Sequence, residues 1–109
     1  MAGREKEIEP YIVRRLIFIR PAAEADLMAA KRWYEERRAG LGAQLLEVVD
    51  RALKDLEERA EKYPLYYREF RSVLLRRFPY KVFYRVENER VVVFRILHAK
   101  RDHPRHLGG

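Results

Sequence analysis

The chain has 109 residues, no cysteine, and 24 basic against 17 acidic residues, which gives a net charge of +7. A chain of this length forms one domain, and an apolar fraction of 48% predicts a globular fold rather than a disordered one. The lack of cysteine excludes disulfides and cysteine-based zinc sites and is compatible with a reducing compartment. No apolar run approaches the ~18 residues of a membrane span, and the charged N-terminus excludes a signal peptide.

The N-terminal part predicts a leader and then a strand. Residues 1–10 lack periodicity, so we expect a flexible leader before a single domain at residues 11–107. The segment YIVRRLIFIR, residues 11–20, has bulky apolar residues at both even and odd positions, so both faces of a strand formed here would be apolar. This pattern predicts a strand covered on both faces. Pro21 ends the strand and suits the first turn of a helix.

Two helices follow the strand. Apolar residues recur at helical spacing over residues 22–38 and again from Leu45 to about Tyr63. The connector AGLG is short, so the pair is predicted to form an antiparallel helical hairpin.

Beyond Pro64 the apolar period changes from helical spacing to alternation and short continuous runs. These patterns predict strands at about residues 66–70, 71–78, 80–86 and 90–98, with the sequence ENE turning the last pair into a hairpin. The expected fold class is α+β: an N-terminal strand, a helical hairpin, and a mainly antiparallel sheet of three to four strands with a basic C-terminal tail.

The net charge is concentrated in the second half of the chain. Residues 1–62 hold 13 basic and 13 acidic residues, whereas residues 63–109 hold 11 basic and four acidic ones. Neighbouring cations on a sheet repel one another unless an anion bridges them, which predicts a phosphate-bearing partner. The alternative is that these cations only protect exposed strand edges from aggregation. The candidate nucleic-acid-binding residues are Arg71, Arg76, Arg77, Arg85, Arg95, Lys100, His103 and Arg105.

The same segment limits the chemistry available for cutting a nucleic acid. Two-metal hydrolysis requires converging carboxylates, and the four acidic residues lie mostly at predicted turns. RNA can be cleaved without a metal by its own 2′-OH, if cations stabilise the developing charge and another group moves protons. The candidate cations are Lys81, Arg85, Arg95 and Arg101, and the candidate proton-transfer groups are His98, His103, His106, Tyr80 and Tyr84.

Each proton-transfer candidate also has a structural interpretation. Tyr80 and Tyr84 alternate with the valines of their strand at every second position, so they are predicted to lie on the same face as these valines, which is typical of core packing. His98 ends an apolar strand and fits a single capping hydrogen bond equally well. The spacing of His98, His103 and His106 does not support a metal site, because no carboxylate cluster assists them.

The order of elements, together with RPAAEADLMAAKRWYEERRAGLGAQLL and RRFPYKVFYRVENERVVVFRILHAKRDH, resembles the RelE/ParE superfamily of type II toxins across residues 11–107. The resemblance implies a cytoplasmic, growth-inhibiting toxin that needs no cofactor and is neutralised by a cognate antitoxin. RelE-like members cleave mRNA on the ribosome as metal-independent mRNA interferases, and ParE-like members poison DNA gyrase. We expect mRNA cleavage first, gyrase inhibition as the alternative, and a non-toxic nucleic-acid-binding module as a further alternative.

The resemblance also implies site residues. The RelE pattern matches Lys81 and Arg101 as catalytic cations. Leu107 stands at the position of a tail tyrosine, so His98, His103 or His106 is expected to take over its role, and His98 is the candidate catalytic residue among them. Two lysines of the RelE pattern correspond to Ser72 and Leu74 here, which is a departure from that pattern.

Overall fold

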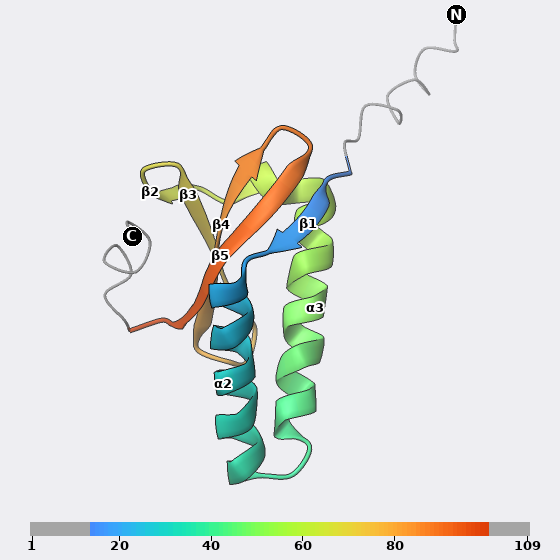
Figure 1. Ribbon diagram of the computed structural model, residues 1–109, viewed down its shortest axis with the longest axis vertical. Coiled ribbons are helices and arrows are strands. Elements are labelled where there is room, and N and C mark those ends of the chain that lie inside the picture. The colour runs from blue at the N-terminus through green and yellow to red at the C-terminus, as the bar shows by residue number, and fades with distance from the viewer. Residues whose placement is uncertain (1–13, 101–109) are drawn as a thin grey trace, which may run out of the picture.

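The computed structural model describes residues 14–100, which fold into a helical hairpin packed on one face of a five-stranded sheet (Figure 1). The predicted leader, residues 1–10, and the tail beyond Lys100 lie outside the described residues. The elements in chain order are β1 (Leu16–Ile19), α2 (Pro21–Arg37), α3 (Leu41–Arg59), the short 3-10 helix η2 (Ala60–Lys62), β2 (Leu65–Tyr67), β3 (Phe70–Leu74), β4 (Tyr80–Glu87) and β5 (Arg90–His98).

The strand order is β1-β5-β4-β3-β2, with β1 parallel to β5 and all other pairs antiparallel. The predicted α+β class and the order of its elements are therefore confirmed. No helix within residues 14–100 is long and apolar enough to cross a membrane.

The prediction that the first strand is covered on both faces is wrong. Within the described residues this strand spans only Leu16–Ile19, and it forms an edge of the sheet. Leu16 and Phe18 are 76% and 55% exposed, whereas Ile17 packs against the main core. The sequence of this strand has apolar side chains on both of its faces, but the helices cover only one face.

The structure also differs from the prediction in where the strands before and after residue 70 begin and end. Arg68 has a φ of +53°, so the chain turns there, β2 ends at Tyr67 and Phe70 begins β3. β3 ends at Leu74 rather than at residue 78, and Arg77 in the loop that follows has a φ of +71°. A residue in the left-handed region interrupts an extended strand, and apolar periodicity does not reveal that change.

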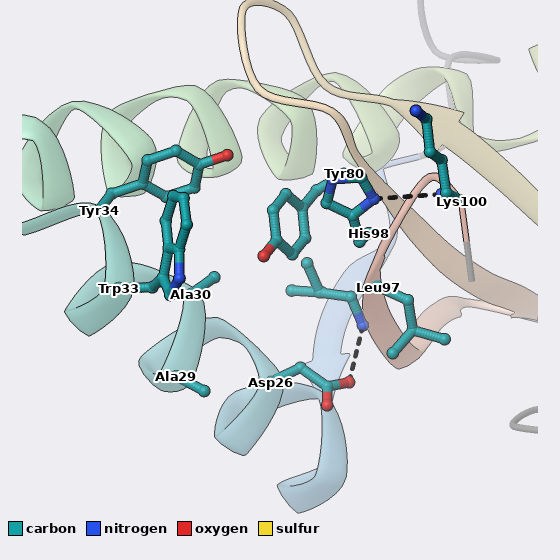
Figure 2. A pocket seen from close by; sticks show the side chains of 10 residues that line it. Asp26, Ala29, Ala30, Trp33, Tyr34, Tyr80, Leu97, His98 and Lys100 are labelled. Atoms are coloured by element: carbon teal, nitrogen blue, oxygen red, sulfur yellow. Dashed lines mark hydrogen bonds between the residues drawn. The ribbon is translucent and has the colours of Figure 1, made fainter. Parts of the chain in front are cut away.

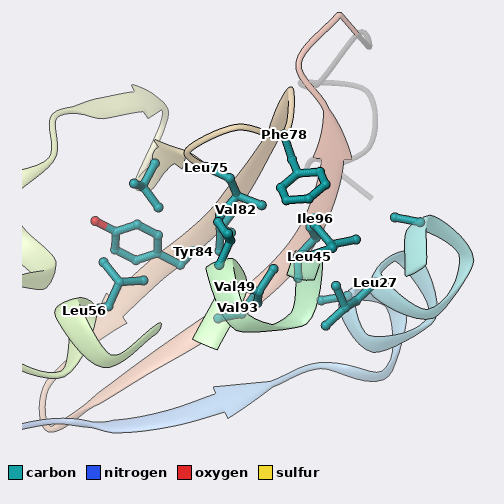
Figure 3. Packing of buried hydrophobic residues seen from close by; sticks show 14 of the residues in the cluster. Leu27, Leu45, Val49, Leu56, Leu75, Phe78, Val82, Tyr84, Val93 and Ile96 are labelled. Atoms are coloured by element: carbon teal, nitrogen blue, oxygen red, sulfur yellow. The ribbon is translucent and has the colours of Figure 1, made fainter. Parts of the chain in front are cut away.

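The main core lies between the helical hairpin and the sheet (Figure 3). Helix residues spaced by three, four and seven positions meet alternating residues of β4 and those residues of β5 that face the helices, where a register shift in the β4–β5 ladder separates Val93 from Ile96 by three positions. The most buried large side chains of this cluster are Leu45, Val49, Leu56, Val82, Tyr84, Val91, Val93 and Ile96. We call this side of the sheet the helix face.

A smaller cluster lies on the opposite side, which we call the outer face. Phe70, Phe83 and Leu97 are buried there, with Tyr67 and Phe94 packed against them. Val82 belongs to the helix face and Phe83 to the outer face, as expected for neighbours on a strand.

The turn of the helical hairpin is fixed by one carboxylate. Glu35 accepts backbone hydrogen bonds from Gly40 at 2.8 Å and from Gly42 at 2.9 Å. Gly40 has a φ of +90°, a conformation that favours glycine. A Cβ on Gly42 would lie 2.9 Å from the carbonyl oxygen of Lys31, so the two helices approach closely only because this residue is glycine.

Candidate functional site

The predicted site residues that fall within residues 14–100 lie on both faces of the sheet and in the β3–β4 loop. Lys81 lies on β4 one position before Val82, so it shares the outer face with Phe83. His98 and Lys100 line a pocket on the other side, beside α2. Arg76 and Arg77 line a separate groove against α3. The fold therefore does not gather these residues around one point.

Lys81 has apolar neighbours on the adjacent strands. It is half-buried and lies opposite Leu74 on β3 and Leu97 on β5. Its Nζ is 5.3 Å from the ring centroid of Tyr66, within the range of a cation–π contact. Ser72 lies opposite Phe83 on the same face. The two positions that carry lysines in the RelE pattern thus bring no further positive charge beside Lys81.

Arg85 lies on the outer face within a set of charges and rings that balance it. Its Nε donates to Glu87 at 2.8 Å, and its Nη1 is 3.6 Å from Glu69. The guanidinium carbon lies 5.0 Å from the ring centroid of Phe94. Hydrogen bonds from Arg85, and then from Arg90, lower the pKa of the Glu87 carboxyl.

Arg95 makes a bidentate ion pair with Asp26 of α2, at 2.7 and 2.8 Å. The backbone N–H of Ile96 donates to the same carboxylate at 3.0 Å. The Asp26 hydrogen bonds raise the pKa of Arg95 above its usual value, with burial opposing them. This cation is held by a carboxylate of its own chain.

Arg71 has a structural role at the end of the helical hairpin. Its Nη1 donates to the carbonyl oxygens of Tyr63 and Glu61, at 2.5 and 3.4 Å. Tyr84, opposite Arg71 in the β3–β4 register, donates its hydroxyl to the Ala60 carbonyl at 2.6 Å. Both contacts hold the segment that connects α3 to the sheet.

The end of β5 borders an open pocket of about 560 Å³ between this strand and α2 (Figure 2). Trp33 and Tyr34 line it from α2, Tyr80 and His98 line it from the sheet, and Lys100 lines it from just beyond the end of β5. The rings of Tyr80 and His98 meet edge to face with centroids 5.3 Å apart. The Nδ1 of His98 accepts the backbone N–H of Lys100 at 3.2 Å. Burial, and then the neighbouring Tyr80, raise the pKa of the Tyr34 hydroxyl.

This pocket contains features that the sequence analysis missed. Trp33 is 48% exposed and stacks under Arg37, whose guanidinium carbon lies 3.5 Å from the ring centroid. In the sequence, Trp33 is the single tryptophan and directly precedes Tyr34, an apolar position of the first predicted helix. That pattern did not indicate that Trp33 lines a pocket. Asp26 and Arg95 are 69 positions apart in the sequence, so no local sequence pattern predicts their contact.

The predicted residues Arg101, His103 and Arg105 lie outside the described residues. Among residues 14–100, no group of three or more histidine, aspartate or glutamate side chains is arranged to hold a metal ion.

A family model described as the ParE toxin of the type II toxin-antitoxin system parDE matches residues 17–103, which are 87 of the 109 residues. The chain belongs to the ParE toxin family. The match covers all the described strands and helices except the first residue of β1. The predicted membership of the RelE/ParE superfamily is thereby confirmed. No curated protein sequence matches the chain.

Two solved structures share this ParE-type fold. One is described as the chromosomal ParDE toxin-antitoxin system from P. aeruginosa, with a TM-score of 0.72 and 20% identity over 80% of this chain and 98% of that one. The other is the toxin-antitoxin complex RelBE2 from Mycobacterium tuberculosis, with a TM-score of 0.56 and 25% identity over 82% of this chain and 97% of that one. At 20% identity the first likeness shows the fold alone.

Proposed function

We propose that this chain is the growth-inhibiting toxin of a type II toxin-antitoxin pair and that it acts on DNA gyrase, as ParE-like toxins do. The observation that carries this proposal is the match to the ParE toxin model across residues 17–103. A cognate antitoxin is the expected partner, since both solved relatives are described as toxin-antitoxin systems or complexes.

The geometry of the cations supports gyrase over mRNA as the target. Cleavage of a phosphodiester by cations requires several of them to face one phosphate. Arg85 and Arg95 are held by carboxylates of this chain, and Arg71 is held by backbone carbonyls. Inhibition through protein contacts needs no such cluster of cations.

A gyrase assay with purified components tests the proposal directly. The full-length protein is added to gyrase, relaxed plasmid and ATP, and the DNA is examined for lost supercoiling and for trapped linear DNA. A type I topoisomerase acting on the supercoiled form of the same plasmid is the control, and its relaxing activity should be unaffected. Unchanged gyrase activity at concentrations that stop bacterial growth would remove this target.

mRNA cleavage remains the second candidate because of the geometry at one end of β4 and β5. Tyr80 lies opposite His98 in the strand register, and Lys100 follows the same strand end and lines the same pocket, whereas Lys81 faces the other side of the sheet. A cation and an imidazole are the two kinds of group that metal-free RNA cleavage needs. In induced cells this activity would give translation arrest and mRNA cut within codons, whereas gyrase poisoning would give DNA breaks while mRNA stays intact.

A further inference from the structure

β1 is the outermost strand of the sheet on the side opposite β2, and β5 occupies one of its two edges (Figure 1). Leu16 and Arg20 donate their N–H groups toward β5, at 3.1 and 3.0 Å. Because backbone groups alternate in direction along a strand, Ile17 and Ile19 direct their N–H and C=O groups away from β5. Within residues 14–100 no strand pairs with these groups, which we call the free β1 edge.

The residues on either side of the free β1 edge limit how another strand can pair with it. Arg15 precedes the edge, and its N–H already donates to the Glu57 carbonyl of α3 at 2.8 Å. Pro21 follows the edge and has no N–H. The backbone groups open to a partner strand are therefore those of Ile17 and Ile19.

The side chains of β1 form an uncovered apolar surface. Leu16 and Phe18 are 76% and 55% exposed, and Ile19 is 38% exposed. The four residues of the strand, LIFI, include neither a charge nor a proline, the two kinds of residue that protect an exposed strand edge from pairing. A surface of this kind is typical of a place where another chain binds.

Arg20 and Glu89 lie near opposite ends of β1, and neither makes an ion pair within residues 14–100. Glu89 lies beside Leu16, with which it lines a pocket at the β4–β5 turn. Arg20 follows the other end of the strand, with its guanidinium carbon 4.3 Å from the ring centroid of Phe94. A second β1 strand running in the opposite direction would bring its own Arg20 to the end where Glu89 lies.

We propose that a second copy of this chain pairs with the free β1 edge, so that the two β1 strands run antiparallel about a two-fold axis at Phe18. In this register Ile17 of each copy exchanges two main-chain hydrogen bonds with Ile19 of the other, which uses all the open groups. The two Phe18 side chains lie directly opposite each other across the axis, where aromatic pairs stabilise a ladder.

The neighbouring registers fit the edge less well. An axis at Ile17 would require the N–H of Arg15, which α3 already holds. An axis at Ile19 would require an N–H from Pro21, which has none. The axis at Phe18 is thus the one for which every hydrogen-bonding group of the pairing is open.

The same register pairs charges that have no partner within residues 14–100 of one copy. Arg20 of each copy lies opposite Leu16 of the other, beside Glu89, so the dimer contains this ion pair twice. The net charge of +7 on each copy opposes association, and the interface is small, so we expect a weak and reversible dimer. This inference does not depend on the target of the toxin.

Sedimentation velocity of the full-length protein at physiological ionic strength, from about 1 μM to about 1 mM, tests the dimer. We expect a monomer at the low end and a dimer at the high end. Hydrogen exchange should show the amides of Ile17 and Ile19 protected in the dimer and not in the monomer. A monomer at every concentration would overturn the proposal. Protection of these amides in such a monomer would identify another segment of the same chain as the occupant of the edge.

A matched pair of variants tests the place of the interface. Phe18→Asp puts like charges opposite each other at the axis and should weaken dimerisation at least about tenfold. Leu74→Asp makes the same kind of change on β3, at a side chain of similar exposure (58%), and should leave the affinity within about twofold of the parent. Equal weakening of the two folded variants, or the reverse order, would contradict an interface at β1.

A charge exchange tests the register. Arg20→Glu should weaken the dimer at least about tenfold by breaking both ion pairs, although it lowers the net positive charge that opposes association. Adding Glu89→Arg to this variant should restore the affinity to within about threefold of the parent. If the folded double variant stays as weak as Arg20→Glu alone, the two residues do not meet and the proposed two-fold register is wrong.

Discussion

Asp26 on α2 holds Arg95 on β5 through two hydrogen bonds, at 2.7 and 2.8 Å, and accepts the backbone N–H of Ile96 at 3.0 Å. β1 stops pairing with β5 just before this point, where Arg20 donates its N–H to Val93 at 3.0 Å. One side chain of the first helix therefore continues the hydrogen bonding of β5 after its parallel partner ends. The same carboxylate neutralises a cation that the sequence suggested for nucleic-acid binding.

Asp26→Ala should lower the free energy of unfolding by about 2–4 kcal/mol, since it leaves a partly buried guanidinium and a backbone N–H without their acceptor. The midpoint of urea unfolding measures the effect. Glu47→Ala, at an exposed position of α3, is the control and should change stability by less than about 0.5 kcal/mol. An unchanged midpoint for Asp26→Ala would mean that this ion pair does not contribute to stability.

Gly42→Ala should destabilise the helical hairpin by about 1–3 kcal/mol, because the added methyl group would meet the Lys31 carbonyl oxygen at 2.9 Å. Ala43→Ser, at the exposed neighbouring position, provides the comparison. Thermal unfolding followed by circular dichroism measures both variants. If Gly42→Ala proved as stable as the parent, the close approach of α2 and α3 would be incorrect.

The Glu35 carboxyl is expected to make the free energy of unfolding fall as the pH becomes acidic. The backbone N–H groups of Gly40, and then of Gly42, hold the pKa of this carboxyl below its ordinary value of 4.5. A carboxyl whose pKa is lower in the folded state stabilises the fold above the unfolded pKa, and this contribution is lost as the pH falls through the folded pKa. Glu35→Gln should therefore flatten the fall of stability below about pH 4.5. Glu36→Gln, one residue along, should keep the slope of the parent in urea titrations at several pH values.

Tyr84→Phe tests the link between the sheet and the end of α3. The Tyr84 side chain is fully buried, its hydroxyl donates to the Ala60 carbonyl at 2.6 Å, and burial raises its pKa far above the usual range. Removal of the hydroxyl leaves that carbonyl unsatisfied and should cost about 1–2 kcal/mol in urea unfolding. A variant as stable as the parent would show that the carbonyl finds another donor.

Lys81→Ala should leave growth inhibition and the effect on gyrase unchanged, since the proposed activity does not use a cation at a scissile phosphate. If the chain instead cleaved mRNA, the loss of such a cation would lower the rate by about 10²- to 10³-fold. Growth after induction at matched protein levels measures the difference.

Arg101→Ala and His98→Ala extend this test to the other two predicted catalytic residues, and Arg32→Ala on α2 is the control that should remain toxic. Loss of toxicity in folded Lys81→Ala and Arg101→Ala proteins would contradict gyrase as the target and support mRNA cleavage.

The sequence by itself determined the α+β class, the helical hairpin and the four C-terminal strands, because apolar periodicity and the AGLG turn are local signals. It did not reveal that β1 is an exposed edge strand, since periodicity reports which residues are apolar and not how many layers cover them. Nor did it reveal which cations are already paired. Arg95 meets Asp26 across 69 residues and Arg71 meets carbonyls at the end of α3, so only the packing of helices on the sheet decides which positive charges remain available to a partner.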